Sequence, residues 1–393
     1  MSKFRLHTPD GVRDIIGDEC RKKLSIENTV SSIIDSYGYD PIQTPSFEFF
    51  DLFGSSIGTV SSKELYKFFD REGETIVLRP DFTPSVARCA GKYFNNSNCP
   101  IRLYYNGRVF SNHKRLRGNL NERSQIGGEC IGDPSIEADA EMIAMLVRTL
   151  ESCGLSEFGI SIGHAAVFDS LVDALALNED DIDEIHSLAA NKNFFALDEF
   201  LEKRNANPDI RGIFQKLSSM YKSPEEFKEL TDAFKVPNGL SDALLRLSKL
   251  SNLLDIYEAS DHVSYDLGFV SEYRYYTGIV FSGFTYGSGQ PIVSGGRYDR
   301  LLNKFGKDSP AIGFAIDIDQ LLISLDRQSI STEAKTVKKL IVYLEDHSKK
   351  AIEKADELRS LGEKVMLYKI KDRSEYEALM NGSEGTDLIY IGD

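Results

Sequence analysis

Two carboxylic acids in the sequence lie where an unpaired charge would be costly. Asp81 lies in Leu78-Arg-Pro-Asp-Phe-Thr83 and Glu129 in Gln125-Ile-Gly-Gly-Glu-Cys-Ile-Gly132, and both have apolar neighbours in strand-like segments. A carboxylate in such a place requires a cation, a hydrogen-bond donor or a ligand. A salt bridge at a sheet edge would satisfy each acid as well as a ligand would, so the two residues alone leave both interpretations open.

A pair of tyrosines and two glycine-rich segments are further binding candidates. Tyr275 and Tyr276 lie in a strand-like segment, where aromatic residues are as typical of sheet packing as of ligand contact. Gly287-Ser-Gly289 and Gly295-Gly296 could approach a phosphate. Neither has the lysine of a P-loop or the spacing of a dinucleotide-binding loop, so both are more typical of turns.

The elements that would position these residues do not alternate regularly between strand and helix. Apolar spacing predicts helices over 19–37 and 135–151, and nearly continuous helix over about 165–260. Strands are expected at 65–70, 75–79, 101–110, 125–131, 158–162, 262–267, 275–284, 291–294 and 311–316. Antiparallel hairpins interrupted by a helical insertion predict an α+β domain over residues 1–326.

A polar segment, 327–335, is expected to link this domain to a small α/β module over 336–393. Strands are predicted there at 339–344, 364–368 and 387–391, and helices at 348–361 and 374–380. The order strand, helix, strand, helix, strand is typical of a βαβαβ unit.

Composition narrows the class of protein. The formal net charge of −15 over 393 residues disfavours RNA binding, because contacts to phosphates require a basic surface. The chain shows neither a bilayer-spanning apolar stretch nor a secretion signal, so a cytoplasmic location without membrane association is expected. Five cysteines and six histidines are scattered without ligand spacing, so no disulfide, metal site or cofactor is expected.

Several motifs, taken in order, resemble the catalytic domain of class II aminoacyl-tRNA synthetases, and in particular the histidyl-tRNA synthetase family. They include Pro9-Asp-Gly-Val-Arg-Asp14, Leu78–Thr83, Gln125–Gly132, Tyr275-Tyr-Thr-Gly278, Gly295-Gly-Arg-Tyr-Asp299 and Pro310-Ala-Ile-Gly-Phe-Ala315. The resemblance implies a large antiparallel sheet with flanking helices, and self-association as a dimer through the first part of the domain. The module at 336–393 resembles a shortened anticodon-binding domain.

The resemblance also implies a histidine pocket. The residues that it assigns to the ligand are Asp81, Thr83, Gln125, Glu129, Tyr275 and Tyr276. The first three would hold the α-amino group, and Glu129 with Tyr276 would contact the imidazole ring. Because Ser271 stands where the family has an arginine, Arg274 and Arg297 remain alternative partners for the carboxylate.

The residues with which that family handles ATP are replaced. Ser111, His113, Ser271 and Gln320 stand at positions where the resemblance implies arginines or, at His113, a glutamate. Adenylate formation depends on positioning and on stabilising charge at a phosphoryl group, and losing one such donor typically costs about 10²–10³ in rate. The pocket is therefore expected to hold histidine without activating it.

This combination resembles the family of regulatory subunits of hetero-oligomeric ATP phosphoribosyltransferase, the first enzyme of histidine biosynthesis. The resemblance implies a non-catalytic protein that binds the short catalytic subunit, is required for its full activity, and helps to confer feedback inhibition by histidine. Two alternatives remain: a divergent histidyl-tRNA synthetase with substitute cations, and a synthetase paralogue that binds tRNA or another protein as a stress sensor.

Restoring the missing arginines should not restore catalysis. We expect the triple variant Ser111→Arg, Ser271→Arg, Gln320→Arg to show no histidine-dependent exchange of pyrophosphate with ATP, because the residues that would support such arginines have also changed. Robust exchange by the triple variant, measured beside the unmodified chain, would contradict this interpretation.

Overall fold

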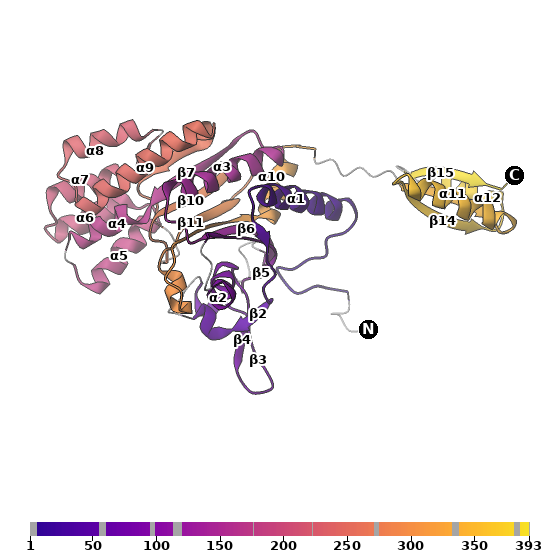
Figure 1. Ribbon diagram of the computed structural model, residues 1–393, viewed down its shortest axis with the longest axis horizontal. Helices are drawn as coiled ribbons and strands as arrows, with labels where there is room; N and C mark the ends of the chain where they lie inside the picture. Colours follow the sequence, from indigo (N-terminus) through magenta and orange to yellow (C-terminus); the bar gives the residue numbers. More distant parts are fainter. Residues whose placement is uncertain are drawn as a thin grey trace. The chain divides into compact units, whose positions relative to one another are not determined.

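The computed structural model describes residues 6–54, 60–94, 99–112, 120–175, 177–221, 223–270, 275–331, 338–380 and 386–392 (Figure 1). It divides into two compact units, Met1–Thr332 and Glu333–Asp393. The division falls within the polar segment 327–335. None of the described helices has the length and apolar character that crossing a bilayer requires.

A large sheet forms the centre of the first unit. Within the described ranges it has nine strands in the order β1-β5-β6-β12-β11-β10-β7-β9-β8, antiparallel except for the parallel pairs β1–β5 and β7–β9. The strands are β1 Asp40–Pro41, β5 Ile101–Phe110, β6 Glu122–Ile131, β7 Phe158–His164, β8 Met220–Tyr221, β9 Val263–Asp266, β10 Ile279–Thr285, β11 Val293–Arg297 and β12 Ala311–Asp317. The predicted α+β class is confirmed.

Different helices cover the two faces of this sheet (Figure 1). One face packs against α1 (Gly17–Ser36), α3 (Ile136–Ser152) and α10 (Ile318–Arg327) in the main core. The other face packs against α2 (Thr83–Tyr93) and the 3₁₀ segment Leu301–Phe305 in a smaller core. Because side chains alternate along a strand, neighbouring residues of β6, β11 and β12 face different cores.

The helical insertion gathers at the β7–β9–β8 end of the sheet (Figure 1). Its helices are α4 Ala165–Asp173, α5 Glu179–Ala190, α6 Phe194–Lys203, α7 Pro208–Lys216, α8 Lys228–Ala233 and α9 Asn238–Ile256. Leu240, Leu244, Leu247 and Leu254 recur at helical spacing and are buried along one side of α9. That helix packs against both α3 and α4, which attaches the insertion to the central domain.

A small antiparallel sheet precedes α2, with strand order β2-β4-β3. Its strands are β2 Phe47–Phe49, β3 Lys67–Phe69 and β4 Thr75–Leu78. The predicted hairpin between the last two strands is present, and Gly73 has the positive φ of 89° that this turn requires.

One predicted strand, 275–284, was wrong over its first four residues, because β10 begins at Ile279. Thr277 instead donates its backbone N–H to the Arg297 carbonyl at 2.7 Å, and its hydroxyl accepts from the Asp299 backbone N–H at 2.9 Å. Tyr275 and Tyr276 therefore belong to a connecting segment held against the end of β11.

The second unit is a parallel sheet of order β14-β13-β15 within the described residues. Its elements are β13 Lys338–Leu344, α11 Ser348–Ser360, β14 Lys364–Ile370, α12 Arg373–Met380 and β15 Thr386–Ile391. These agree with the βαβαβ order expected from the sequence. The two helices contribute to separate core clusters, formed by alternate residues of β13.

Two leucines of α9 offer a matched test of how the insertion is held. Leu247 is fully buried, whereas Leu245 is 55% exposed. We expect Leu247→Ala to lower the free energy of unfolding by about 2–5 kcal/mol, because it removes buried methyl groups and leaves a cavity. Leu245→Ala should change it by no more than about 0.5 kcal/mol. Urea unfolding followed by circular dichroism compares them, and equal losses would contradict this packing.

Candidate functional site

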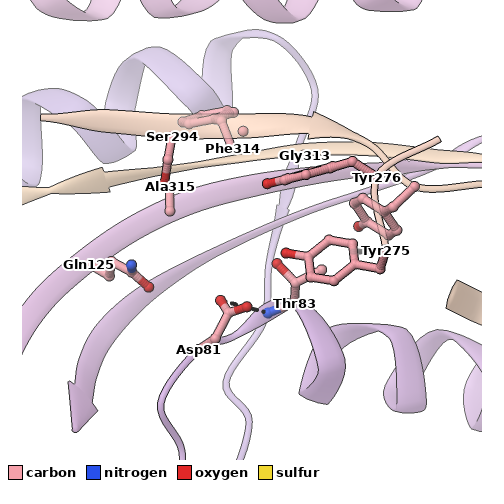
Figure 2. A pocket seen from close by; sticks show the side chains of 11 residues that line it. Asp81, Thr83, Gln125, Tyr275, Tyr276, Ser294, Gly313, Phe314 and Ala315 are labelled. Atoms are coloured by element: carbon pink, nitrogen blue, oxygen red, sulfur yellow. Dashed lines mark hydrogen bonds between the residues drawn. The ribbon is translucent and has the colours of Figure 1, made fainter. Parts of the chain in front are cut away.

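A narrow cavity lies between the central sheet and the start of α2 (Figure 2). Its wall is formed by Asp81, Thr83, Gln125, Tyr275, Tyr276, Ser294, Gly295, Tyr298, Gly313, Phe314 and Ala315. Only about 20 Å³ of its space is wide enough for the centre of a water molecule. It therefore has room for about one water, and a ligand of amino-acid size requires its walls to separate.

Two oxygen-bearing side chains in this wall are suited to accept hydrogen bonds from a ligand. Asp81 Oδ1 accepts the Thr83 backbone N–H at 3.3 Å, and burial raises the pKa of this carboxyl although backbone hydrogen bonds oppose the shift. Gln125 Oε1 is buried and has no hydrogen-bond partner in the described part of the chain. An ammonium group, which carries three N–H donors, would satisfy both acceptors.

Glu129 lies behind the cavity wall and is fully buried. The Thr83 hydroxyl donates to its Oε1 at 2.7 Å, and the Tyr298 hydroxyl donates to its Oε2. Gly313 is opposite Glu129 in the pairing of β6 with β12. A Cβ at Gly313 would lie 1.6 Å from Glu129 Oε2, so this position requires glycine.

Burial raises the pKa of Glu129 to about 8, although the hydrogen bonds from Tyr298 and Thr83 oppose the shift. Asp81 adds a smaller effect in the same direction as burial, because a nearby negative charge disfavours ionisation. Glu129 is therefore mostly a neutral acid at neutral pH, and it presents a hydrogen-bonded polar group without a full charge.

Most of the residues predicted for the site come together at this cavity. Those that line it are Asp81, Thr83, Gln125, Tyr275 and Tyr276, and Glu129 lies directly behind them. The Thr83 hydroxyl already donates to Glu129, so its contribution to an amino-group contact would be indirect. Tyr298 was not among the predicted site residues, but it lines the cavity, and its ring meets that of Tyr275 edge-on with centroids 5.8 Å apart.

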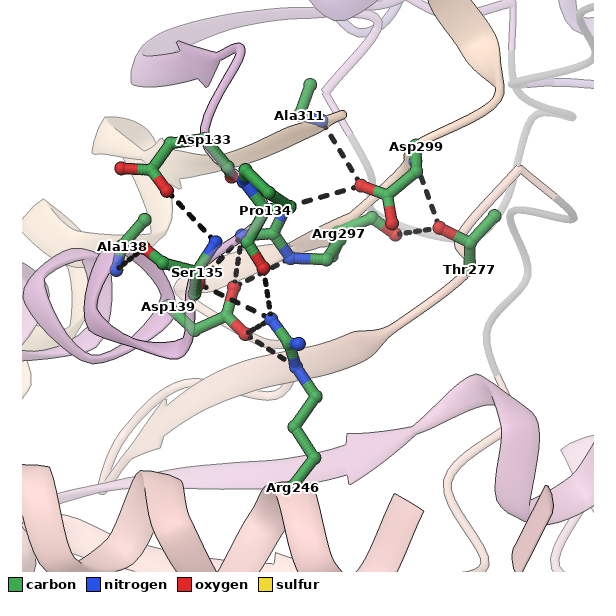
Figure 3. Close-up of polar contacts among 10 residues, drawn as sticks. All are labelled: Asp133, Pro134, Ser135, Ala138, Asp139, Arg246, Thr277, Arg297, Asp299 and Ala311. Atoms are coloured by element: carbon green, nitrogen blue, oxygen red, sulfur yellow. Dashed lines mark hydrogen bonds and ion pairs between the residues drawn. The ribbon is translucent and has the colours of Figure 1, made fainter. Parts of the chain in front are cut away.

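Arg297 was one of two predicted partners for the ligand carboxylate, but it does not line the cavity. It is 2% exposed, and its guanidinium binds Asp139 Oδ1 of α3 through Nε at 2.8 Å and Nη2 at 2.6 Å (Figure 3). Alternation along β11 gives the physical reason, because Arg297 faces α3 whereas Ser294 and Tyr298 face the cavity. That alternation was the signal in the sequence that would have selected Tyr298.

Two positions where the resemblance implied ATP-binding residues, Ser111 and Gln320, are distinct from this wall. Ser111 follows β5, is buried, and donates its backbone N–H to the Asn121 carbonyl at 2.9 Å. Gln320 lies in the first turn of α10, and its Oε1 accepts from the Ser288 hydroxyl at 3.5 Å. Among the described wall residues there is no lysine or arginine. His113, Ser271 and Arg274 lie outside the described residues.

Ionisation of Glu129 should make the stability of the fold depend on pH. The folded protein keeps this proton up to about pH 8, whereas an ordinary glutamate loses it near 4.5. Within that window the folded state binds more protons, so the free energy of unfolding falls as pH rises, by at most about 1.4 kcal/mol per pH unit. Glu129→Gln imitates the neutral acid, so it removes this fall in the free energy of unfolding.

We therefore expect the melting temperature of Glu129→Gln to rise relative to the unmodified chain between about pH 5 and about pH 9. Thermal unfolding at a series of pH values measures the difference. Parallel melting curves for the two proteins would show that Glu129 ionises normally in the folded state.

Comparison with known proteins places these features in a family. A family model described as histidyl-tRNA synthetase matches residues 11–321. A protein of Ruminiclostridium cellulolyticum named ATP phosphoribosyltransferase regulatory subunit is 38% identical, covering 100% of this chain and 94% of the relative. A protein of the same name from Acetivibrio thermocellus is 35% identical, with coverage of 92% and 86%.

Solved structures agree with this assignment. An ATP phosphoribosyltransferase regulatory subunit/histidyl-tRNA synthetase from Bacillus halodurans C is 30% identical, covers 99% of both chains and superposes with a TM-score of 0.88. A histidyl-tRNA synthetase from Nostoc sp. PCC 7120 has a TM-score of 0.82 at 21% identity, covering 100% of this chain and 92% of that one, which shows a shared fold. The chain belongs to the family of ATP phosphoribosyltransferase regulatory subunits, built on the fold of the histidyl-tRNA synthetases.

Proposed function

We propose that this chain is the non-catalytic regulatory subunit of a hetero-oligomeric ATP phosphoribosyltransferase, and that its narrow cavity binds histidine as the feedback inhibitor. In this role it associates with a short catalytic subunit and with a second copy of itself. The relatives at 35–38% identity carry the name of such a subunit, and the cavity provides a chemically suitable place for the effector.

The proposal is carried by the side-chain oxygen of Gln125, which has no hydrogen-bond partner among the described residues, together with the carboxyl of Asp81. Both belong to the same cavity wall, which has no basic residue in its described part. An α-ammonium group supplies the positive charge and the N–H donors that this arrangement lacks. Tyr275, Tyr276 and Tyr298 provide aromatic walls for a planar ring, with the hydrogen-bonded Glu129 behind them.

The same wall is poorly suited to a nucleotide triphosphate. Phosphoryl transfer sites stabilise negative charge with arginine, lysine or a metal ion. In the described part of this wall the ionisable groups are a carboxyl and three tyrosines, which add no positive charge. Ser111 and Gln320, at positions where the resemblance implied arginines, are neutral and bound within the protein. These features favour a histidine sensor over an enzyme that activates histidine.

Inhibition by histidine would follow from linkage. A ligand shifts an equilibrium only to the extent that it binds one state better than another. Because the cavity is too narrow for an amino acid as it stands, histidine must favour a conformation with a wider cavity. The effect on the catalytic subunit is then a coupling free energy between two sites, for which about 1–3 kcal/mol is typical.

Gln125→Ala should weaken inhibition by histidine and leave assembly with the catalytic subunit intact. A hydrogen bond to a charged group is typically worth about 1.5–3 kcal/mol, so the histidine concentration for half-inhibition should rise by about tenfold or more. The measurement is the ATP phosphoribosyltransferase activity of the mixed subunits over a histidine titration. Size-exclusion chromatography checks assembly.

Gln320→Ala is the matched control, because it truncates a second glutamine that lies outside the cavity wall. Its titration should coincide with that of the unmodified chain. If histidine inhibits the Gln125→Ala complex as strongly as the unmodified complex, histidine binds outside this cavity. Histidine-dependent pyrophosphate exchange by the unmodified chain would instead favour a divergent synthetase.

A further inference from the structure

A buried carboxylate joins the cavity-bearing sheet to the helical insertion. Asp139, in the first turn of α3, has no exposed surface. Its Oδ1 binds the guanidinium of Arg297 from β11, and its Oδ2 binds that of Arg246 from α9, through Nε at 3.0 Å and Nη2 at 2.5 Å (Figure 3). One acid therefore connects segments from two parts of the domain that are far apart in the sequence.

Both arginines also bind the backbone at the start of α3. Arg297 Nη2 donates to the Ser135 carbonyl at 3.3 Å, and Arg246 Nη2 donates to the Pro134 and Ser135 carbonyls at 3.1 and 3.3 Å. Burial raises the pKa of Asp139, and the two guanidiniums act against that shift. Removing either arginine leaves the buried Asp139 carboxylate with only one guanidinium partner. Such a loss is strongly destabilising in other proteins.

The cavity wall is attached to the other end of this network. Tyr276 packs so closely on Gly296 that a Cβ there would lie 2.7 Å from its ring. The next residue, Thr277, bonds to the Arg297 carbonyl at 2.7 Å and to the Asp299 N–H at 2.9 Å. The Asp299 carboxylate in turn accepts from Arg297 Nη1 at 3.2 Å. A displacement of Tyr276 therefore acts on the residues that hold Arg297.

Such a displacement would widen the cavity. Much of its wall consists of β6, β11 and β12, and β12 pairs with both of the others in the sheet. Tyr275 and Tyr276 precede β10 and have no place in a strand ladder. A ligand that enters the cavity can displace this segment without breaking the pairing of the strands.

We propose that histidine binding and the docking of α9 favour each other through the Arg297–Asp139–Arg246 network, which makes the helical insertion the part of the chain that reports whether the cavity is occupied. Arg246 is then a positioning residue, which acts on the cavity without touching the ligand. This inference rests on the proposed function, because histidine is the ligand that fills the cavity.

Two charge-removing variants of α9 test the proposal. Arg246→Gln breaks the bidentate contact with Asp139. Lys249→Gln is its control, because Lys249 is exposed on the same helix and its side chain makes no ion pair or hydrogen bond with the described residues. Calorimetry of the full chain should show roughly 3- to 30-fold weaker histidine binding for Arg246→Gln and no change for Lys249→Gln. Arg246→Lys, which keeps the charge, should recover part of the loss.

Hydrogen exchange provides a measurement that does not depend on a variant. In the unmodified chain, histidine should slow amide exchange over residues 242–249 of α9 as well as in the cavity strands, because coupling between two sites is reciprocal. In folded Arg246→Gln the slowing should remain in the strands and be lost from α9.

The outcomes separate this inference from the function on which it rests. If histidine slows exchange only in the cavity strands, or if folded Arg246→Gln binds histidine as tightly as the control, the network does not couple the two parts. If Arg246→Gln does not fold, amide exchange in the unmodified chain decides whether the network couples the two parts. If the unmodified chain does not bind histidine at all, the proposed function fails, and this inference fails with it.

Discussion

A carboxylate withdrawn from water must be compensated inside the protein, and this requirement organises the centre of the domain. Glu129 and Asp139 are both fully buried, on opposite faces of the same sheet. Two consecutive residues after Gly296 compensate them: Arg297 binds Asp139 on the α3 face, and Tyr298 donates to Glu129 on the cavity face. The alternation of side chains at the end of β11 thus supplies a cation to one acid and a neutral donor to the other.

The two acids differ in charge because their partners differ. Asp139 has two guanidiniums beside it, which stabilise its ionised form. Glu129 has no cation beside it, so burial favours its neutral form up to about pH 8, and the two hydroxyls that donate to it offset only part of that effect. The ionic group holds helices and sheet together, whereas the neutral group lies next to the cavity. A polar site without a strong fixed charge suits reversible binding of an amino acid better than phosphoryl chemistry.

The fold itself does not decide between reversible binding of an amino acid and phosphoryl chemistry. A synthetase of 21% identity superposes with a TM-score of 0.82, and one fold often supports several functions. In the proposed function the difference lies in individual side chains, such as Ser111 and Gln320, at positions where the resemblance to the synthetases implies positive charge.

Regular patterns in the sequence predicted much of the architecture. Strands such as 101–110 and helices such as α3 agreed with expectation, because alternation and helical spacing reflect which side is buried. The strand expected from Tyr275 began only at Ile279, since aromatic residues favour strands while the hydrogen bonds of Thr277 hold this segment against β11. Local propensity does not include such long-range contacts.

The sequence by itself predicted most of the strands in their order, the family, and five residues of the cavity wall: Asp81, Thr83, Gln125, Tyr275 and Tyr276. Only the tertiary structure decided that Arg297 faces away from the cavity, that Tyr298 takes a place beside Glu129, and that Arg246 reaches the same acid as Arg297. The physical reason is that the direction of a side chain depends on strand pairing and on partners more than a hundred residues away. Residue identity and local spacing do not contain that information.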